Sequence, residues 1–388
     1  MHEESATVAY DTALSEEQQA VRNLARDFAE SEIRPVVMQY DESQEFPADL
    51  FRKMAELGFL GITVPVELGG SGLGFVEYAL IVEEIARVDP SVALGVAAHN
   101  GLCTGHILRF GSEELKSRYI PRLATGETMG AWGLTEPGSG SDASGMQTVA
   151  RRDGNEWIIN GSKNFITHGT VGDIAVVMAV TNREAGASGI SAFVLDKSMP
   201  GFSASKKENK LGMRCSDTSS LVFEDVRVPA ENLIGEEGQG FRQALQILDG
   251  GRISIAALSV GLAQGAFDAA MKYANERRQF SRKLAEFQAI QFKLAMMATE
   301  IEASRLLTYK AAYLRDAGRE YATQASMAKY YASETSVRAA LEAVQIHGGY
   351  GYIKEYPVEK FYRDAKLLTI GEGTSEIQKI VISRAVLR

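Results

Sequence analysis

The sequence predicts a mainly α-helical protein with a β domain in the middle of the chain. Apolar residues recur at helical spacing toward both ends, whereas strand-like runs and turn signals fill about residues 128–240. The 388 residues are also more than one ordinary core holds. We therefore predict a helical domain over 1–127, an antiparallel β domain over 128–240 and a C-terminal four-helix bundle over 241–388.

The N-terminal part carries helix signals. Ser15-Glu16-Glu17-Gln18 is a capping box, in which the Ser and Gln side chains each accept from an N–H at the helix start. Apolar residues then follow at helical spacing as far as Phe28, and Pro35 closes or kinks the helix. Further helices are predicted over 50–60, 79–86 and 92–110.

The middle part has a different pattern. Glu156–Ile159 and Lys163–Thr167 are strand-like runs on either side of Asn160-Gly161, a strong short signal for a β-hairpin. Further strands are expected over 174–180, 190–195 and 221–228.

The helical pattern returns after Gly240, where long helices are predicted over 241–275, 287–316 and 321–347. In the second of these, apolar residues alternate spacings of three and four, which is the period of a bundle seam. We expect this stripe to be core: Phe287, Ile290, Leu294, Met297 and Ile301.

Composition excludes several classes of function. A net charge of -9 argues against nucleic acid as a main partner. No apolar run approaches the roughly 18 residues of a membrane span, and Met1–Glu4 lacks the features of a targeting peptide. We expect a cytoplasmic protein, with a processed mitochondrial form as the alternative.

The thiols and imidazoles also give little sign of a metal site. Cys103 and Cys215 form no disulfide framework and no paired ligand motif, which fits a reducing compartment. The five histidines are scattered without ligand spacing. We expect no bound metal.

The most informative motif lies near the C-terminus, where Glu372 stands between Gly371 and Gly373 after an apolar run. Glycines on both sides let a flat ligand approach the backbone closely. An apolar surround raises the pKa of a carboxyl group, which makes a base usable near neutral pH. The alternative is an ordinary solvated loop glutamate.

Three other segments are rich in glycine or cations. Gly133–Asp142 contains Gly138-x-Gly140-x-x-Ala143, but the strand and helix that a dinucleotide fingerprint needs around it are not predicted. What remains is a loop able to present N–H groups and hydroxyls to a ligand. Gln345–Tyr352 and Glu276–Phe280 each end a helix, and Arg277 is either dipole compensation or a phosphate ligand.

Taken together, these motifs strongly resemble the acyl-CoA dehydrogenase family, and the match covers essentially the whole chain. Gly133–Gly145 is similar to the family's first signature and Gln345–Asp364 to its second. The resemblance implies non-covalently bound FAD, an acyl-CoA substrate, a homotetramer and an electron-transferring flavoprotein as partner. It implies oxidation of a short- to medium-chain or branched acyl-CoA to the trans-2-enoyl-CoA.

The resemblance also implies roles for individual residues. Glu372 would remove the α-proton, while its backbone N–H helps to bind the thioester oxygen. Contacts with FAD are implied for Trp132, Gly133, Leu134, Thr135, Ser141, Phe165, Ile166, Thr167, Arg277, Phe280, Gln288, Gln345, Ile346, Gly348, Gly349, Thr374 and Glu376, and contacts with substrate for Ser141, Asp249, Arg252 and Gly373.

Within that set, Thr135 would bond the flavin ring and Phe165, where many relatives have Trp, would cover its other face. Arg277 and Gln288 would reach across a dimer interface to the neighbouring subunit's cofactor, and Gln345–Gly349 would belong to the same contact. For Arg252, a structural ion pair is about as good an interpretation.

Two positions bear on the choice of base and on specificity. Isovaleryl-type members carry their base on a helix just before an arginine, but Gly251 precedes Arg252 here, so Glu372 is favoured. Gly371 stands where several straight-chain members have Tyr. Together with Gly250 and Gly251 it removes bulk near the expected acyl pocket, which would either admit a branched chain or reshape a short straight pocket.

Two rival functions remain at this point. One is a flavin oxidase or monooxygenase on the same fold, which would react with dioxygen. The other is a non-catalytic scaffold, which the retained Glu372, Arg277 and glycine loops disfavour.

Overall fold

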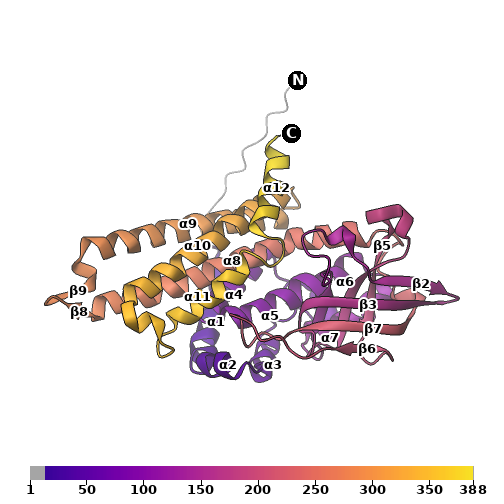
Figure 1. The fold of residues 1–388 in the computed structure, drawn as a ribbon, viewed down its shortest axis with the longest axis horizontal. Coiled ribbons are helices and arrows are strands. Elements are labelled where there is room, and N and C mark those ends of the chain that lie inside the picture. Colours follow the sequence, from indigo (N-terminus) through magenta and orange to yellow (C-terminus); the bar gives the residue numbers. More distant parts are fainter. Residues whose placement is uncertain (1–13, 388) are drawn as a thin grey trace.

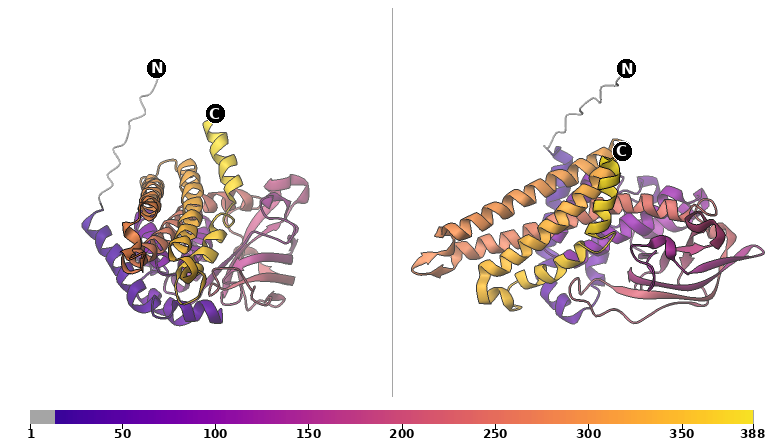
Figure 2. Two further views of the ribbon diagram at one scale, coloured as in Figure 1. Left: turned by 60° about the vertical axis from the view of Figure 1, so that its left-hand side comes forward. Right: turned by 45° about the horizontal axis from the view of Figure 1, so that its top comes forward.

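The computed structural model describes residues 14–387, so the expectation about Met1–Glu4 lies outside the described part. Helical regions from both ends of the chain pack together, and a sheet of strands lies beside them (Figure 1). The fold class is the predicted one: an N-terminal helical region, a middle sheet and a C-terminal helical region. The views of Figure 2 show the sheet at one end of the molecule and the β8–β9 hairpin projecting from the other.

The N-terminal region begins at the predicted capping box: Ser15 Oγ accepts from Gln18 N at 3.1 Å, and Gln18 Oε1 accepts from Ser15 N at 3.1 Å. A π-helical turn, Ala29–Ile33, ends this helix just before Pro35. The described helices of this region are α1 (Glu16–Phe28), α2 (Val37–Ser43), α3 (Ala48–Glu56), α4 (Phe75–Ala86), α5 (Pro90–Ala98), α6 (Gly105–Phe110) and α7 (Glu113–Ala124). A second π-helical turn, His99–Thr104, joins α5 to α6.

The middle region is one mixed sheet with the order β1-β4-β2-β3-β7-β6, and β5 pairs with β4. Most pairs are antiparallel as predicted, but β1 and β2 each run parallel to β4. The strands are β1 (Gly130–Gly133), β2 (Val149–Asp153), β3 (Glu156–Thr167), β4 (Ile174–Val180), β5 (Ile190–Asp196), β6 (Phe202–Ala204) and β7 (Thr218–Pro229).

The hairpin predicted at Asn160-Gly161 is wrong. Both residues lie inside β3, where the register against β7 shifts between Ile159 and Gly161. Gly161 has a φ of 144°, and the Asn160 side chain bridges to the Asp225 backbone N–H at 2.9 Å. The Asn-Gly pair therefore makes a β-bulge, and the turn lies earlier, between β2 and β3.

The C-terminal region confirms the three long helices within about one residue. They are α8 (Gly240–Glu276), α9 (Gln288–Asp316) and α10 (Ala322–His347), followed by α11 (Val358–Leu368) and α12 (Ser375–Val386); the β8 (Arg278–Gln279) and β9 (Arg282–Lys283) hairpin joins α8 to α9. Among the described helices, α8 has the length and mean hydropathy of a membrane span, but 78% of its most apolar window is buried inside the protein. We interpret it as a core helix.

The largest apolar core lies between the N-terminal helices and the long C-terminal helices. Of the predicted stripe, Met297 and Ile301 are fully in this core, and Ile290 and Leu294 pack against it. The expectation is wrong for Phe287, which precedes the first turn of α9 and is only partly buried outside this core. The opposite face of α9 leaves Phe292 exposed.

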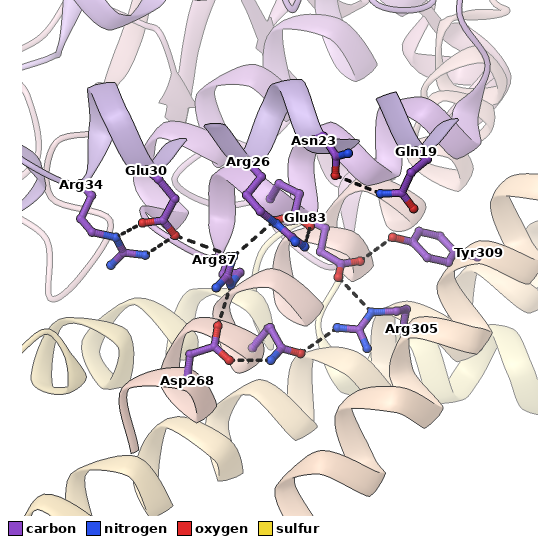
Figure 3. Close-up of polar contacts among 12 residues, drawn as sticks. Gln19, Asn23, Arg26, Glu30, Arg34, Glu83, Arg87, Asp268, Arg305 and Tyr309 are labelled. Atoms are coloured by element: carbon purple, nitrogen blue, oxygen red, sulfur yellow. Dashed lines mark hydrogen bonds and ion pairs between the residues drawn. The ribbon is translucent and has the colours of Figure 1, made fainter. Parts of the chain in front are cut away.

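Polar contacts also join the two helical regions (Figure 3). The buried Glu83 of α4 accepts hydrogen bonds from two side chains of α9, Arg305 Nε at 2.9 Å and Tyr309 Oη at 2.7 Å. Since a buried carboxylate without partners would be costly, this pairing fixes α4 against α9. The same network contains the ion pairs Arg26–Glu84, Arg34–Glu30 and Arg87–Asp268.

Candidate active site

Glu372 lies in the short segment between α11 and α12, in an unusual backbone conformation. Its φ is 52°, in the left-handed region that few residues with a side chain adopt. The turn is closed by two backbone hydrogen bonds, Gly371 N to Leu367 O at 2.8 Å and Ser375 N to Thr369 O at 3.0 Å. A residue held in this way at the end of a helix is a candidate for a functional role.

The Glu372 carboxylate points inward. Its Oε2 is shielded from solvent and has no hydrogen-bond partner among the described residues. Burial raises the pKa of Glu372 from 4.5 to about 7, and the nearby cations Lys329 and Arg252 oppose the rise. The result is a carboxyl group that exchanges a proton near neutral pH.

Gly251 of α8 lies directly against this carboxylate. A Cβ at Gly251 would come within 2.1 Å of Glu372 Oε2 and within 3.6 Å of Leu102 Cδ2. The two base positions compared in the sequence therefore converge on one space, and it is the carboxylate of Glu372 that occupies it. This explains why a glycine is needed at 251.

Arg252 is buried and forms the structural ion pair considered in the sequence. Its Nη1 donates to Asp249 Oδ1 at 2.6 Å and to Ser326 Oγ at 3.1 Å, while its Nε has no partner among the described residues. Asp249 and Arg252 thus hold each other beside Glu372. Burial lowers the pKa of Arg252, against the charge of Asp249.

The wall facing Glu372 contains residues that the sequence did not single out. Tyr78 of α4 donates its hydroxyl to Ala97 O at 2.7 Å. Leu102 of the π-helical turn packs in one apolar cluster with Trp132 of β1. This cluster connects the Glu372 side of the site to the edge of the sheet.

The Gly133–Asp142 loop lies next to β3, as the implied flavin site requires. Asn164 N donates to Thr135 O at 2.8 Å, which places Thr135 beside Phe165. Phe165 is 65% exposed and has a φ of 58°. The Phe165 backbone is left-handed and its aromatic ring is exposed, so the ring is available to cover a flat ligand.

A buried ion pair fixes this loop. Lys163 Nζ of β3 contacts Glu136 Oε1 at 2.6 Å, and both side chains are at most 5% exposed. The same carboxylate accepts from Gln147 N at 2.5 Å and Thr148 N at 3.0 Å. Glu136, the acidic residue of Thr135-Glu136-Pro137, therefore holds the loop in place through its buried carboxylate.

Trp132 is oriented by a chain of hydrogen bonds. Its Nε1 donates to His106 Nδ1 at 3.0 Å, and His106 Nε2 lies 3.0 Å from Gln243 Oε1. Burial lowers the pKa of His106 to about 4, so the imidazole is neutral and its Nε2–H donates to Gln243. The indole of Trp132 is thus locked beside the loop.

A second group of implied cofactor residues surrounds a cavity of about 510 Å³ between the start of the β8–β9 hairpin and the end of α10. Its lining includes Arg277, Ile346, Gly348 and Gly349. A Cβ at Gly348 or Gly349 would meet no atom within 4 Å. The Arg277 guanidinium lies over the Tyr350 ring, 5.3 Å from its centroid.

The two groups lie far apart in one chain. The first group lies on β1, β3 and the loop after β1, in the sheet at one end of the molecule, and the β8–β9 hairpin lies at the opposite end (Figure 1). Residues at the start of this hairpin line the Arg277 cavity. The structure therefore brings together Trp132, Gly133, Leu134, Thr135, Phe165, Ile166 and Thr167, and separately Arg277, Ile346, Gly348 and Gly349, with exposed Phe280, Gln288 and Gln345 on the elements around the second group.

The remaining implied residues lie at the edges of the site. Ser141 is exposed on the loop after Thr135. Thr374 caps α12 by accepting from Ile377 N at 3.3 Å, and Glu376 is exposed in the first turn of that helix. Gly373 presents its carbonyl inward to Lys329.

Comparison with known proteins decides the family. Sequence models of the acyl-CoA dehydrogenase N-terminal, middle and C-terminal domains match residues 15–127, 131–226 and 238–387. The chain belongs to the acyl-CoA dehydrogenase family.

This acyl-CoA dehydrogenase has relatives of similar length. It is 47% identical to a short-chain specific acyl-CoA dehydrogenase of Clostridium acetobutylicum, over 97% of this chain and 100% of that protein. It is 47% identical to CarC, a subunit of the caffeyl-CoA reductase–Etf complex of Acetobacterium woodii, over 96% and 99%. The structure of butyryl-CoA dehydrogenase from Megasphaera elsdenii matches with a TM-score of 0.96 and 44% identity, over 98% of this chain and 100% of that one.

Proposed function

We propose that this acyl-CoA dehydrogenase oxidises a short- to medium-chain or branched acyl-CoA to the trans-2-enoyl-CoA, with Glu372 as the base that removes the α-proton. The buried, unpartnered Oε2 of Glu372 is the observation that carries this proposal. A carboxyl group in a water-poor site with a pKa near 7 is about half ionised at neutral pH, and its carboxylate form is a stronger base than that of an ordinary glutamate.

The residues present fit FAD. The Trp132–Thr135 segment and Phe165, whose side chain is 65% exposed, would hold the ring. Arg277 offers a cation to a pyrophosphate, and the open space at Gly348 and Gly349 lets such a group approach the backbone closely. Bound FAD would supply the acceptor for the hydride that leaves the β-carbon, a role that no amino-acid side chain can take.

The chain's own groups carry the rest of the chemistry. Glu372 takes the α-proton at its carboxylate. Its backbone N–H makes no hydrogen bond to any described residue and is available to the thioester oxygen. The carboxylate Oε2 is shielded from solvent where it lies against Gly251 of α8.

A graded substrate screen tests this function. Under anaerobic conditions, acyl-CoAs of increasing length and branching are mixed with the enzyme and flavin bleaching is followed. We expect short straight chains to be the best substrates, because relatives are named short-chain and butyryl-CoA dehydrogenases. Of the three glycines considered in the sequence, only Gly371 leaves room for a branch, because Arg315 fills the space at Gly250 and Glu372 the space at Gly251. Absence of bleaching by every acyl-CoA would contradict the proposal.

Assembly belongs to the same proposal. Since the Arg277 cavity lies far from the Thr135 loop of its own chain, a complete cofactor site would combine two subunits of a homotetramer. Exposed apolar side chains near the cavity support such an interface: Phe280 is 89%, Phe292 59% and Met296 64% exposed.

Arg277→Ala tests the contribution of a second subunit to the cofactor site. We expect the variant to fold but to purify with clearly less flavin, because a cation over the neighbour's cofactor is lost. The ratio of flavin to protein absorbance measures this, with exposed Arg151→Ala on β2 as the control. Full flavin content in Arg277→Ala would refute the role.

The electron acceptor and the direction of flux complete the proposal. We propose an electron-transferring flavoprotein as acceptor and a cytoplasmic location. Reduction of an enoyl-CoA is a second candidate function, because one relative is a subunit of the caffeyl-CoA reductase–Etf complex and another, 45% identical, is the acryloyl-CoA reductase (NADH) of Anaerotignum propionicum. If an enoyl-CoA oxidises the reduced enzyme faster than air does, the result would favour an enoyl-CoA reductase over an oxidase.

A further inference from the structure

A lysine lies directly beneath the Glu372 segment. Lys329 of α10 is 0% exposed, and its Nζ donates to Gly373 O at 2.6 Å. On its own helix its neighbours one turn away are small and buried: Ala325, Ser326, Ala332 and Ser333. A cation in such a place is costly to bury, so its presence calls for a function.

The carboxylates around Lys329 do not form ion pairs that would offset the cost of burying its charge. Glu334 accepts from Ser375 Oγ at 2.6 Å, and Glu376 is exposed. Lys329 makes no ion pair within contact distance among the described residues. Its hydrogen bond goes to a neutral carbonyl one residue after Glu372.

We propose that Lys329 is a positioning residue, which anchors the Glu372 segment through the Gly373 carbonyl and places an uncompensated positive charge beside the carboxylate. The inference rests on the proposed role of Glu372 as the base. The two functions of Lys329 are separable, because a neutral side chain holds the same carbonyl: Gln378 Nε2 donates to Gly373 O at 2.9 Å.

The groups that face Glu372 from the surrounding helices define the electrostatics. Arg252 of α8 is already paired with Asp249, and Tyr78 of α4 is uncharged because burial raises its pKa far above 10. Lys329 of α10 is thus the cation near Glu372 that has no contact partner of opposite charge. Burial lowers the pKa of Lys329 to about 8, so it is mostly protonated at pH 7.

The consequence concerns the ionisation of the base. Desolvation alone favours the neutral form of Glu372, and the charge of Lys329 counteracts it. Without that charge, Glu372 would be protonated over more of the neutral range. Flavin reduction would then require a higher pH.

The test compares three substitutions at Lys329 with one at Gln378. Lys329→Met removes charge and hydrogen bond, Lys329→Gln removes the charge but keeps a donor, and Lys329→Arg keeps the charge. Gln378→Met removes the neutral donor to the same carbonyl. For each holoenzyme, the rate of anaerobic flavin reduction by the best acyl-CoA is measured between about pH 5 and pH 9.

We expect the rising limb of the pH profile to move up by about one unit in Lys329→Met and Lys329→Gln, as expected for loss of one nearby opposite charge. Lys329→Arg should keep the wild-type midpoint. Gln378→Met should lower the rate without moving the midpoint, because no charge changes. Flavin content and melting temperature show whether each variant is folded.

Two outcomes would overturn the inference: an unshifted midpoint in either neutral Lys329 variant, or an equal shift in Gln378→Met. Either would leave Lys329 with a purely structural role. Failure of the proposed role of Glu372 would give a different result. In that case, Glu372→Gln would reduce its flavin as fast as the wild type does.

Discussion

Glu372→Gln is expected to keep the fold and the flavin. In this variant we expect acyl-CoA to reduce the flavin about 10²–10⁴ times more slowly than in the wild type, which is the usual contribution of a general base. The amide has the shape of the carboxyl group and cannot accept the α-proton. Anaerobic stopped-flow measurement of flavin bleaching gives the rate. The matched control is Glu224→Gln on β7, the same change at an exposed glutamate. Bleaching at the wild-type rate in Glu372→Gln would assign proton removal to another group.

The same variant should show how much folding stability is lost by burying the charged form of Glu372. Because the pKa of Glu372 is raised from 4.5 to about 7, the folded wild type binds the extra proton in this range and loses stability as pH rises through it. The neutral amide does not titrate. Glu372→Gln should therefore equal the wild type in stability near pH 4.5 and exceed it by about 2–3 kcal/mol at pH 8. Melting curves at both pH values measure the difference, and a constant difference would contradict burial of the charge.

Gly251→Ala should slow the enzyme strongly without unfolding it. The new methyl carbon would lie 2.1 Å from Glu372 Oε2, so the carboxylate must move by more than an ångström. A misplacement of about 1 Å in a catalytic group costs on the order of 10²-fold in rate. We expect a fall of that size in flavin reduction, with flavin content unchanged.

Gly371→Ala is the control for this prediction, since it adds the same methyl group on the other side of the base. A Cβ there would meet no atom closer than 3.6 Å, which is ordinary contact. We expect Gly371→Ala to stay within a few-fold of the wild-type rate with a short straight-chain substrate. If the two variants behaved alike, crowding of Glu372 by residue 251 would not be the cause.

Much of the fold could be predicted because its signals are local. The apolar period on α9 and the turn residues that end α8 and α10 set the helix boundaries within about one residue. The error at Asn160-Gly161 arose because a bulge and a turn use the same residues. Only the pairing of β3 with the distant β7 decides between them.

The site was predictable where the chemistry lies in one motif. Glycines on both sides of a carboxylate pointed to Glu372. Lys329, Tyr78 and Leu102 were missed because their role depends on which helices pack against that motif. One signal was present for Lys329: it is a cation among small residues one helical turn away, Ala325, Ser326, Ala332 and Ser333. Such a pattern is compatible with burial but does not show which segment packs against it.

The separation of Arg277 from Thr135 within one chain has a genetic consequence. If each cofactor site takes its base from one subunit and its arginine from the next, two impaired variants complement each other. In a mixed pair of subunits, an Arg277→Ala subunit still supplies Glu372 and borrows Arg277 from its Glu372→Gln neighbour. Co-expressed, the two proteins would show more activity than either has alone, because each mixed pair carries one intact centre beside one that lacks both groups.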